Sequence, residues 1–126
     1  MTLGIASAIA NGWLNVLRGT TFTGLAGLYV KLHIGDPQGS GTAAPSAVTT
    51  RNALTLNAPS GGSSTMSSLA PYAMTATEAI SHVSLWDNPS AGSLVASGAM
   101  SAAKNVNSGD TLTFDTFTVS IAPLAA

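Results

Sequence analysis

The chain has very few charged side chains. Only 7% of its 126 residues are Asp, Glu, Lys or Arg, against roughly 25% in an ordinary soluble domain. The formal net charge is −1, so repulsion between copies is weak. Ser, Thr, Gly and Ala take the places of the missing ions, and such a surface can be covered by another polypeptide with little desolvation of charge. The composition therefore predicts a protein that assembles with other chains.

Basic residues are too sparse for two further classes of partner. The four of them are scattered along the chain, as Arg18, Lys31, Arg51 and Lys104. They cannot neutralise a run of phosphates, so we expect no nucleic-acid binding. They form no polybasic stretch, so we expect no binding to a membrane surface.

Cysteine is absent, which excludes disulfides and thiolate metal sites. The apolar opening of the chain has no Lys or Arg before it, and its first base, Arg18, follows the apolar run. This order is unlike that of a signal peptide, and the segment is too short and interrupted to span a bilayer. We therefore expect neither.

Reactive side chains are also scarce, with two histidines and five acids in the chain. The best catalytic combination would be a serine with His33, Asp36, His82 and Asp87, but no GxSxG elbow accompanies it. The same four side chains have acceptable metal-ligand chemistry, yet hydrogen-bonded strand histidines are the favoured interpretation. The glycine-rich stretches lack the Lys-Ser/Thr pair of a phosphate loop. The sequence predicts no enzyme, no metal and no cofactor.

The first segment that the sequence does specify is an N-terminal helix over residues 3–18, on an arm of residues 1–19. Its apolar side chains recur at helical spacing and form one stripe, and Gly19 is a plausible C-cap. The helix either covers one end of a sheet or packs on a neighbouring subunit, and both alternatives require a buried stripe. The stripe consists of Ile5, Ile9, Trp13 and Leu17.

Residues 20–126 predict a β domain, because short runs with period-two alternation are separated by Gly, Pro and Ser breaks. Pro71 confines one run to an edge or to a strand start. The pattern predicts an all-β fold, an antiparallel, jelly-roll-like β-sandwich of about seven to eight short strands. The expected strands are 28–34, 51–56, 69–74, 79–86, 94–100, 111–114 and 117–121.

A long polar loop, residues 38–50, follows the first strand, and such a loop is either mobile or pinned by a partner. It begins after a tight turn in which the aspartate can bond its own backbone. Arg51 can bridge to Asp36 or Asp87 and tether the loop, or it is a solvated surface arginine. The turn consists of Gly35, Asp36 and Pro37.

Aromatic residues lie on separate elements, which favours packing in a core or an interface over a sugar-binding platform. Trp86, beside Asp87, is expected to anchor a sheet edge or an interface. A glycan-binding module would instead use Trp86, Tyr72 and the loop 38–50. His33 and His82 are a candidate pair across neighbouring strands.

Two long segments resemble a family of small structural proteins of actinobacteriophage virions, described as tail-fibre-like or minor tail proteins. Residues 29–51 (YVKLHIGDPQGSGTAAPSAVTTR) are similar to its KLHxGDP…TTR segment, and residues 82–114 to its HxSxWD segment. The resemblance covers nearly the whole chain in order. It implies a virion component made in the bacterial host cytoplasm, and it brings no catalytic residue.

We therefore expect a non-enzymatic, tail-associated subunit that binds copies of itself, most simply as a trimer, and neighbouring virion proteins. One alternative is a capsid decoration protein, and an alternative of another class is a module that binds host-surface glycans. The residues expected at the interface are Ile5, Ile9, Trp13, Leu17, Tyr72 and Trp86.

Overall fold

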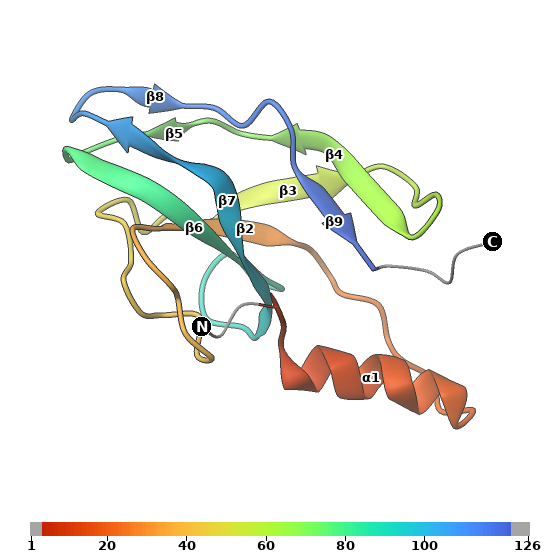
Figure 1. The fold of residues 1–126 in the computed structure, drawn as a ribbon. Coiled ribbons are helices and arrows are strands. Elements are labelled where there is room, and N and C mark those ends of the chain that lie inside the picture. Colours follow the sequence, from red (N-terminus) through yellow and green to blue (C-terminus); the bar gives the residue numbers. More distant parts are fainter. Residues whose placement is uncertain (1–3, 122–126) are drawn as a thin grey trace.

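The computed structural model describes residues 4–121, and these residues fold into antiparallel strands with one short helix (Figure 1). The prediction of an all-β, sandwich-like fold with an N-terminal helix is confirmed. The elements are β1 (Gly4–Ile5), α1 (Ser7–Leu17), β2 (Tyr29–His33), β3 (Asn52–Leu56), β4 (Ser63–Leu69), β5 (Tyr72–Ala73), β6 (Glu78–Trp86), β7 (Leu94–Val106), β8 (Thr111–Leu112) and β9 (Thr118–Ser120).

Seven of the strands form one curled sheet in the order β1-β7-β6-β2-β3-β4-β9, and each neighbouring pair is antiparallel. Strands β5 and β8 pair separately. The curl brings β9 round toward β7, so the two ends of the sheet lie on the same side of the molecule (Figure 1). The sheet therefore comes near to closing on itself but keeps two edges.

The core lies inside this curl, and β2 is at its centre. Val30 and Leu32 have no exposed surface, and from the neighbouring strand β6 the side chains of Ile80 and Val83 join them. Tyr72 packs over the same core, and its hydroxyl donates a hydrogen bond of 2.7 Å to the Val30 carbonyl. The alternation of apolar residues in these strands produces this packing, since alternate side chains share one face.

Two predicted strand boundaries were wrong. Strand β4, Ser63–Leu69, begins inside the expected turn-rich break of residues 59–64 and ends where the strand 69–74 was expected to begin. Its Ser and Thr side chains hide the alternation. Strand β7 is continuous over Leu94–Val106, where the pattern indicates a strand only to residue 100. Its register shifts between Ile80↔Lys104 and His82↔Ala99, so residues 100–103 form a bulge opposite Ser81.

The helix ends close to where its sequence predicts. Arg18 rather than Gly19 is the C-cap, and Gly19 follows it with φ 76°. The Gly19 N–H bonds the Val16 carbonyl and the Thr20 N–H bonds the Asn15 carbonyl, both at 3.0 Å. These two bonds make a Schellman motif, which favours glycine because of its left-handed backbone.

The chain does not bury the apolar stripe against its own sheet, so packing of the stripe on a neighbouring subunit is the alternative that stays a prediction. Ile5 lies in β1 rather than in the helix, and it is 45% exposed. Only Ile9 of the stripe is buried, whereas Trp13 and Leu17 are 38% and 83% exposed. In Figure 1 the helix runs out from the sheet rather than lying along it.

The division into an arm of residues 1–19 and a domain of residues 20–126 stays a prediction, and residues 1–3 and 122–126 lie outside the described part.

We predict that Tyr72→Phe lowers the free energy of unfolding by about 1–2 kcal/mol, because the buried Val30 carbonyl loses its hydroxyl donor. Chemical denaturation measures this loss. Tyr29→Phe is the matched control on a half-buried tyrosine. Equal effects of the two substitutions would contradict the importance of the Tyr72 bond.

Candidate functional site

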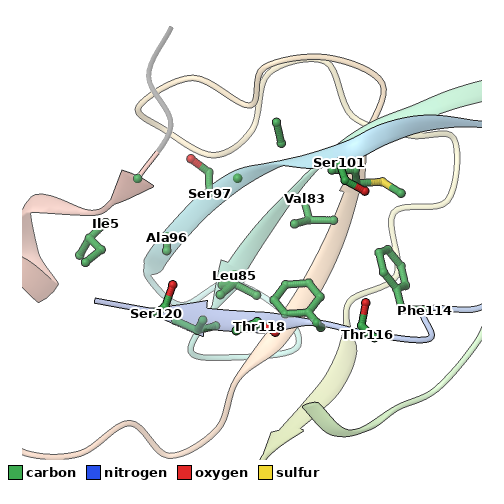
Figure 2. Close-up of a pocket in the computed structure, with 16 residues that line it drawn as sticks. Ile5, Val83, Leu85, Ala96, Ser97, Ser101, Phe114, Thr116, Thr118 and Ser120 are labelled. Atoms are coloured by element: carbon green, nitrogen blue, oxygen red, sulfur yellow. The ribbon is translucent and has the colours of Figure 1, made fainter. Parts of the chain in front are cut away.

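A groove with a volume of about 580 Å³ lies between β7 and β9. We call it the β7–β9 groove. Figure 2 shows Val83 and Leu85 of β6 on its floor, β9 along one wall, and Ile5 at one end. None of its lining residues carries a charge. They are Gly4, Ile5, Val83, Leu85, Ala96, Ser97, Gly98, Ala99, Met100, Ser101, Phe114, Thr116, Phe117, Thr118, Val119 and Ser120.

One wall of the groove is the outer edge of β9. The Phe117 carbonyl accepts from Met66 at 2.7 Å and the Ile121 N–H donates to Gly62 at 2.8 Å, so odd-numbered residues bond β4. Backbone groups alternate in direction along a strand. Those of Thr118 and Ser120 therefore point away from β4, toward the groove.

The opposite wall is the outer edge of β7. Strand β1 pairs with this edge only at Ala96 and Ser97, and within residues 4–121 no strand pairs beyond them. The Val95 carbonyl accepts from the Ala6 N–H at 2.8 Å across the same edge. The direction in which the backbone N–H and C=O groups point repeats every second residue along a strand. The backbone groups of Ala99 therefore also face the groove. The groove thus lies between two strand edges.

A second apolar surface is the C-terminal half of α1, which we call the apolar tip of α1. Its residues are Trp13, Leu14, Val16 and Leu17, and all four are exposed. Leu14 and Val16 are 59% and 53% exposed. Large apolar side chains gathered on one projecting element are typical of a surface that binds another protein.

The loop 38–50 is held in place by hydrogen bonds to its own chain. The sequence predicts a loop that is either mobile or pinned by a partner. The Ile34 N–H bonds the Ala44 carbonyl at 2.9 Å and the Ser46 N–H bonds the Leu32 carbonyl at 3.1 Å. As expected, Asp36 bonds its own backbone, accepting from the Gln38 N–H at 2.8 Å. The loop is therefore attached to the end of β2 by backbone hydrogen bonds.

Glu78, which no sequence pattern singles out, completes the attachment of this loop. Its carboxylate accepts hydrogen bonds from the Ser46 hydroxyl and, at 3.1 Å, from the Ala47 N–H. Glu78 is the only glutamate in the chain, and this rarity was the one available signal. Its role depends on a contact across 32 residues, which no local pattern reveals.

A buried polar chain joins the loop to β2 and β6. His33 lies 2.8 Å from both the Ala43 carbonyl, through Nδ1, and the Ser84 hydroxyl, through Nε2. The Trp86 indole N–H donates to the same hydroxyl at 2.8 Å. Because a carbonyl only accepts, Nδ1 carries the proton and Nε2 accepts from Ser84. This arrangement satisfies every group while the imidazole is neutral.

Burial lowers the pKa of His33, while the bond to the Ala43 carbonyl acts in the opposite direction. A second proton on the ring would leave the Ser84 hydroxyl without its acceptor, because Nε2 would then donate. The desolvation of the cation is the larger effect. His33 is therefore a structural group suited to neutral pH.

Arg51 holds the turn after β6 rather than standing free in solvent. Its guanidinium lies 3.8 Å from the centroid of the Trp86 ring. It donates to the carbonyls of Asn88 at 3.0 Å and Ala91 at 2.5 Å. Burial lowers the pKa of Arg51, and the nearby charge of Asp87 opposes this shift. Arg51 thus joins the end of the long loop to the next turn.

The structure separates the six expected interface residues into two groups. Ile5, Trp13 and Leu17 are exposed, and they remain candidates. Ile9, Tyr72 and Trp86 are only 7%, 2% and 6% exposed, so these side chains pack within their own chain. Tyr72 and Trp86 cannot stack on a sugar without leaving the core, so these two side chains do not form the platform that the glycan-binding alternative requires.

The candidate catalytic residues have structural partners. His33 and His82 are directly opposite on β2 and β6, which confirms their predicted pairing. Asp36 and Asp87 each close a turn, Asp87 by accepting from the Ser93 N–H at 2.7 Å.

In the described part of the chain, no three His, Cys, Asp or Glu side chains gather where they could hold a metal ion. No helix within residues 4–121 is long and apolar enough to cross a membrane.

We predict that the free energy of unfolding falls as the pH drops below about 6.5, the ordinary pKa of histidine. The unfolded chain then binds a proton at His33 that the folded protein binds only at lower pH, and the difference favours unfolding. Denaturant titrations at a series of pH values measure the slope. His33→Gln should flatten it, and an unchanged slope in this variant would contradict the prediction.

Comparison with known proteins gives one family. The family model described as "Podophage GP4 fiber I protein gp80" matches residues 4–122, nearly the whole chain. No curated protein matches the sequence.

Proposed function

Since the chain belongs to the podophage GP4 fiber I protein gp80 family, we propose that it is a fibre subunit that works by assembling with copies of itself and with neighbouring virion proteins. Membership of a phage fibre family makes it a structural protein of the virion. The apolar tip of α1 is the observation that carries the proposed assembly.

Self-assembly is supported by the poverty of charge and by the exposure of the helix. α1 has no acid in its first turn and no base in its last turn. Covering Trp13, Leu14, Val16 and Leu17 removes apolar surface from water, and Arg18 at the C-cap is the only charged residue in the first 30 positions of the chain. We propose that these tips pack against one another in a homo-oligomer, with a trimer as the simplest state.

A purely structural role is supported by what the reactive side chains do. His33 bonds Ala43 and Ser84, Glu78 holds the long loop, and Asp87 closes a turn. Each of these groups has a task in the fold. The proposal therefore assigns no catalytic residue.

The position of this chain within the phage particle is also part of the proposal. We favour a minor tail or tail-fibre position over capsid decoration, in agreement with the family of fibre proteins. An actinobacteriophage origin stays a prediction from the resemblance of the two segments. The number of copies per particle separates the two positions, since hundreds of copies imply a shell and few imply a tail.

We predict that the double substitution Leu14→Ser with Leu17→Ser weakens self-association. Each leucine that is buried on association contributes about 1.5–3 kcal/mol, so each loss should weaken binding by about tenfold or more. Size-exclusion chromatography with light scattering, over a range of concentrations, measures the oligomer. The unmodified chain should have the mass of an oligomer, and the variant that of a monomer.

Ile34→Ser is the matched control, because Ile34 is an exposed apolar residue at 47% that lies outside the helix. It should leave the mass unchanged. A strictly monomeric unmodified chain at high concentration would overturn the proposed self-assembly, as would a double variant that associates normally.

A further inference from the structure

We infer that the β7–β9 groove receives an extended, uncharged segment of a different virion protein, which adds as a strand between β7 and β9. The inference rests on the proposed function only for the source of the segment. Binding of a strand to the groove is a separate property of this chain, which can be tested without any virion.

The hydrogen-bonding groups of the two walls favour a strand. Thr118 and Ser120 direct backbone donors and acceptors into the groove from one side, and Ala99 does so from the other. An extended chain can pair with both walls at once, as in β-strand addition. A helix bonds its own backbone internally, so it would leave both edges unpaired.

The lining determines the chemistry of the added strand. Its floor and walls include Val83, Leu85, Phe117 and Val119, and no charged side chain lines it. A charge on the inward face of the strand would be buried without a partner, which is costly. The segment should therefore carry apolar side chains at alternate positions on that face.

There is room for such a strand next to β1. A Cβ added at Gly98 would meet no atom within 4 Å. Strand β1 already pairs with the same edge of β7 at Ala96 and Ser97, so the added strand would continue an existing mode of pairing. The bulge at residues 100–103 limits the length over which it can pair.

The donor is a different protein, because this chain offers no suitable segment in its described part. The exposed connection 18–28 is uncharged after Arg18, but its apolar residues Phe22, Leu25 and Leu28 lie three apart. Alternate positions on one face of a strand are two apart. The remaining loops have no apolar alternation, and the strands are already paired in their own sheets.

The test uses the full chain, labelled with ¹⁵N, and a synthetic peptide Thr-Val-Thr-Ile-Thr-Val-Thr with blocked ends. On binding, hydrogen exchange of the Thr118 and Ser120 amides should slow by about tenfold or more. A control peptide with aspartate in place of valine and isoleucine should not bind.

Three variants complete the test. Gly98→Leu should fill the groove and abolish peptide binding. Gly24→Leu is its control, since an added Cβ there also meets no atom within 4 Å and Gly24 does not line the groove. Thr118→Pro removes an N–H that faces the groove but keeps the bonds to β4, so it should weaken binding without unfolding the chain.

Several results would overturn the inference. These are unprotected Thr118 and Ser120 amides with peptide present, equal binding of the aspartate peptide, or undiminished binding by Gly98→Leu. Protection of the same amides in the peptide-free chain would mean that a second copy, or the chain's own residues outside 4–121, already fills the groove. The test is separate from that of self-assembly, which is measured by mass.

Discussion

Strand β2 is the element on which the remaining structure depends. It pairs with both β3 and β6, and three of its side chains have no exposed surface. Its Val30 carbonyl receives the Tyr72 hydroxyl, and its His33 ring binds the long loop and Ser84. The core, the loop and the β6–β7 hairpin are thus all attached to one strand.

Within residues 4–121, two surfaces at the periphery are made of uncharged residues. One is the apolar tip of α1, and the other is the β7–β9 groove between two strand edges. An isolated soluble domain ordinarily covers its strand edges or protects them with charge. Here the groove is lined by uncharged residues, and within residues 4–121 no strand pairs with the outer edge of β7 beyond Ser97. A subunit of a phage fibre has neighbours that can cover such surfaces, which accounts for a surface so poor in ions.

Much of the fold could be predicted because it is local. Alternation in Tyr29–His33 and Glu78–Trp86 identified the central strands, and Gly19 identified the end of the helix. Strand β4 was missed because serine and threonine fit either a turn or a strand, and only pairing with β3 and β9 decides between them. Helical spacing identified α1, but spacing alone does not reveal whether a stripe has anything to pack against.

The candidate sites were harder to predict because they arise from long-range contacts. The groove exists only because the sheet curls until β9 approaches β7, and no sequence pattern encodes that approach. Glu78 and Ser84 act on residues far along the chain. Trp86 was expected at an edge or an interface, yet Arg51 and Ser84 enclose it. Aromatic residues are suited to both environments, so composition could not separate them.

The central claim is that this charge-poor subunit is covered by other polypeptides in the virion. A reconstruction of the intact phage particle, at a resolution that traces the backbone, tests it most directly. The account predicts that this chain lies in the fibre or tail with the apolar tip of α1 in contact with another chain. A particle that lacks the chain, or one in which the tip faces solvent, would contradict it.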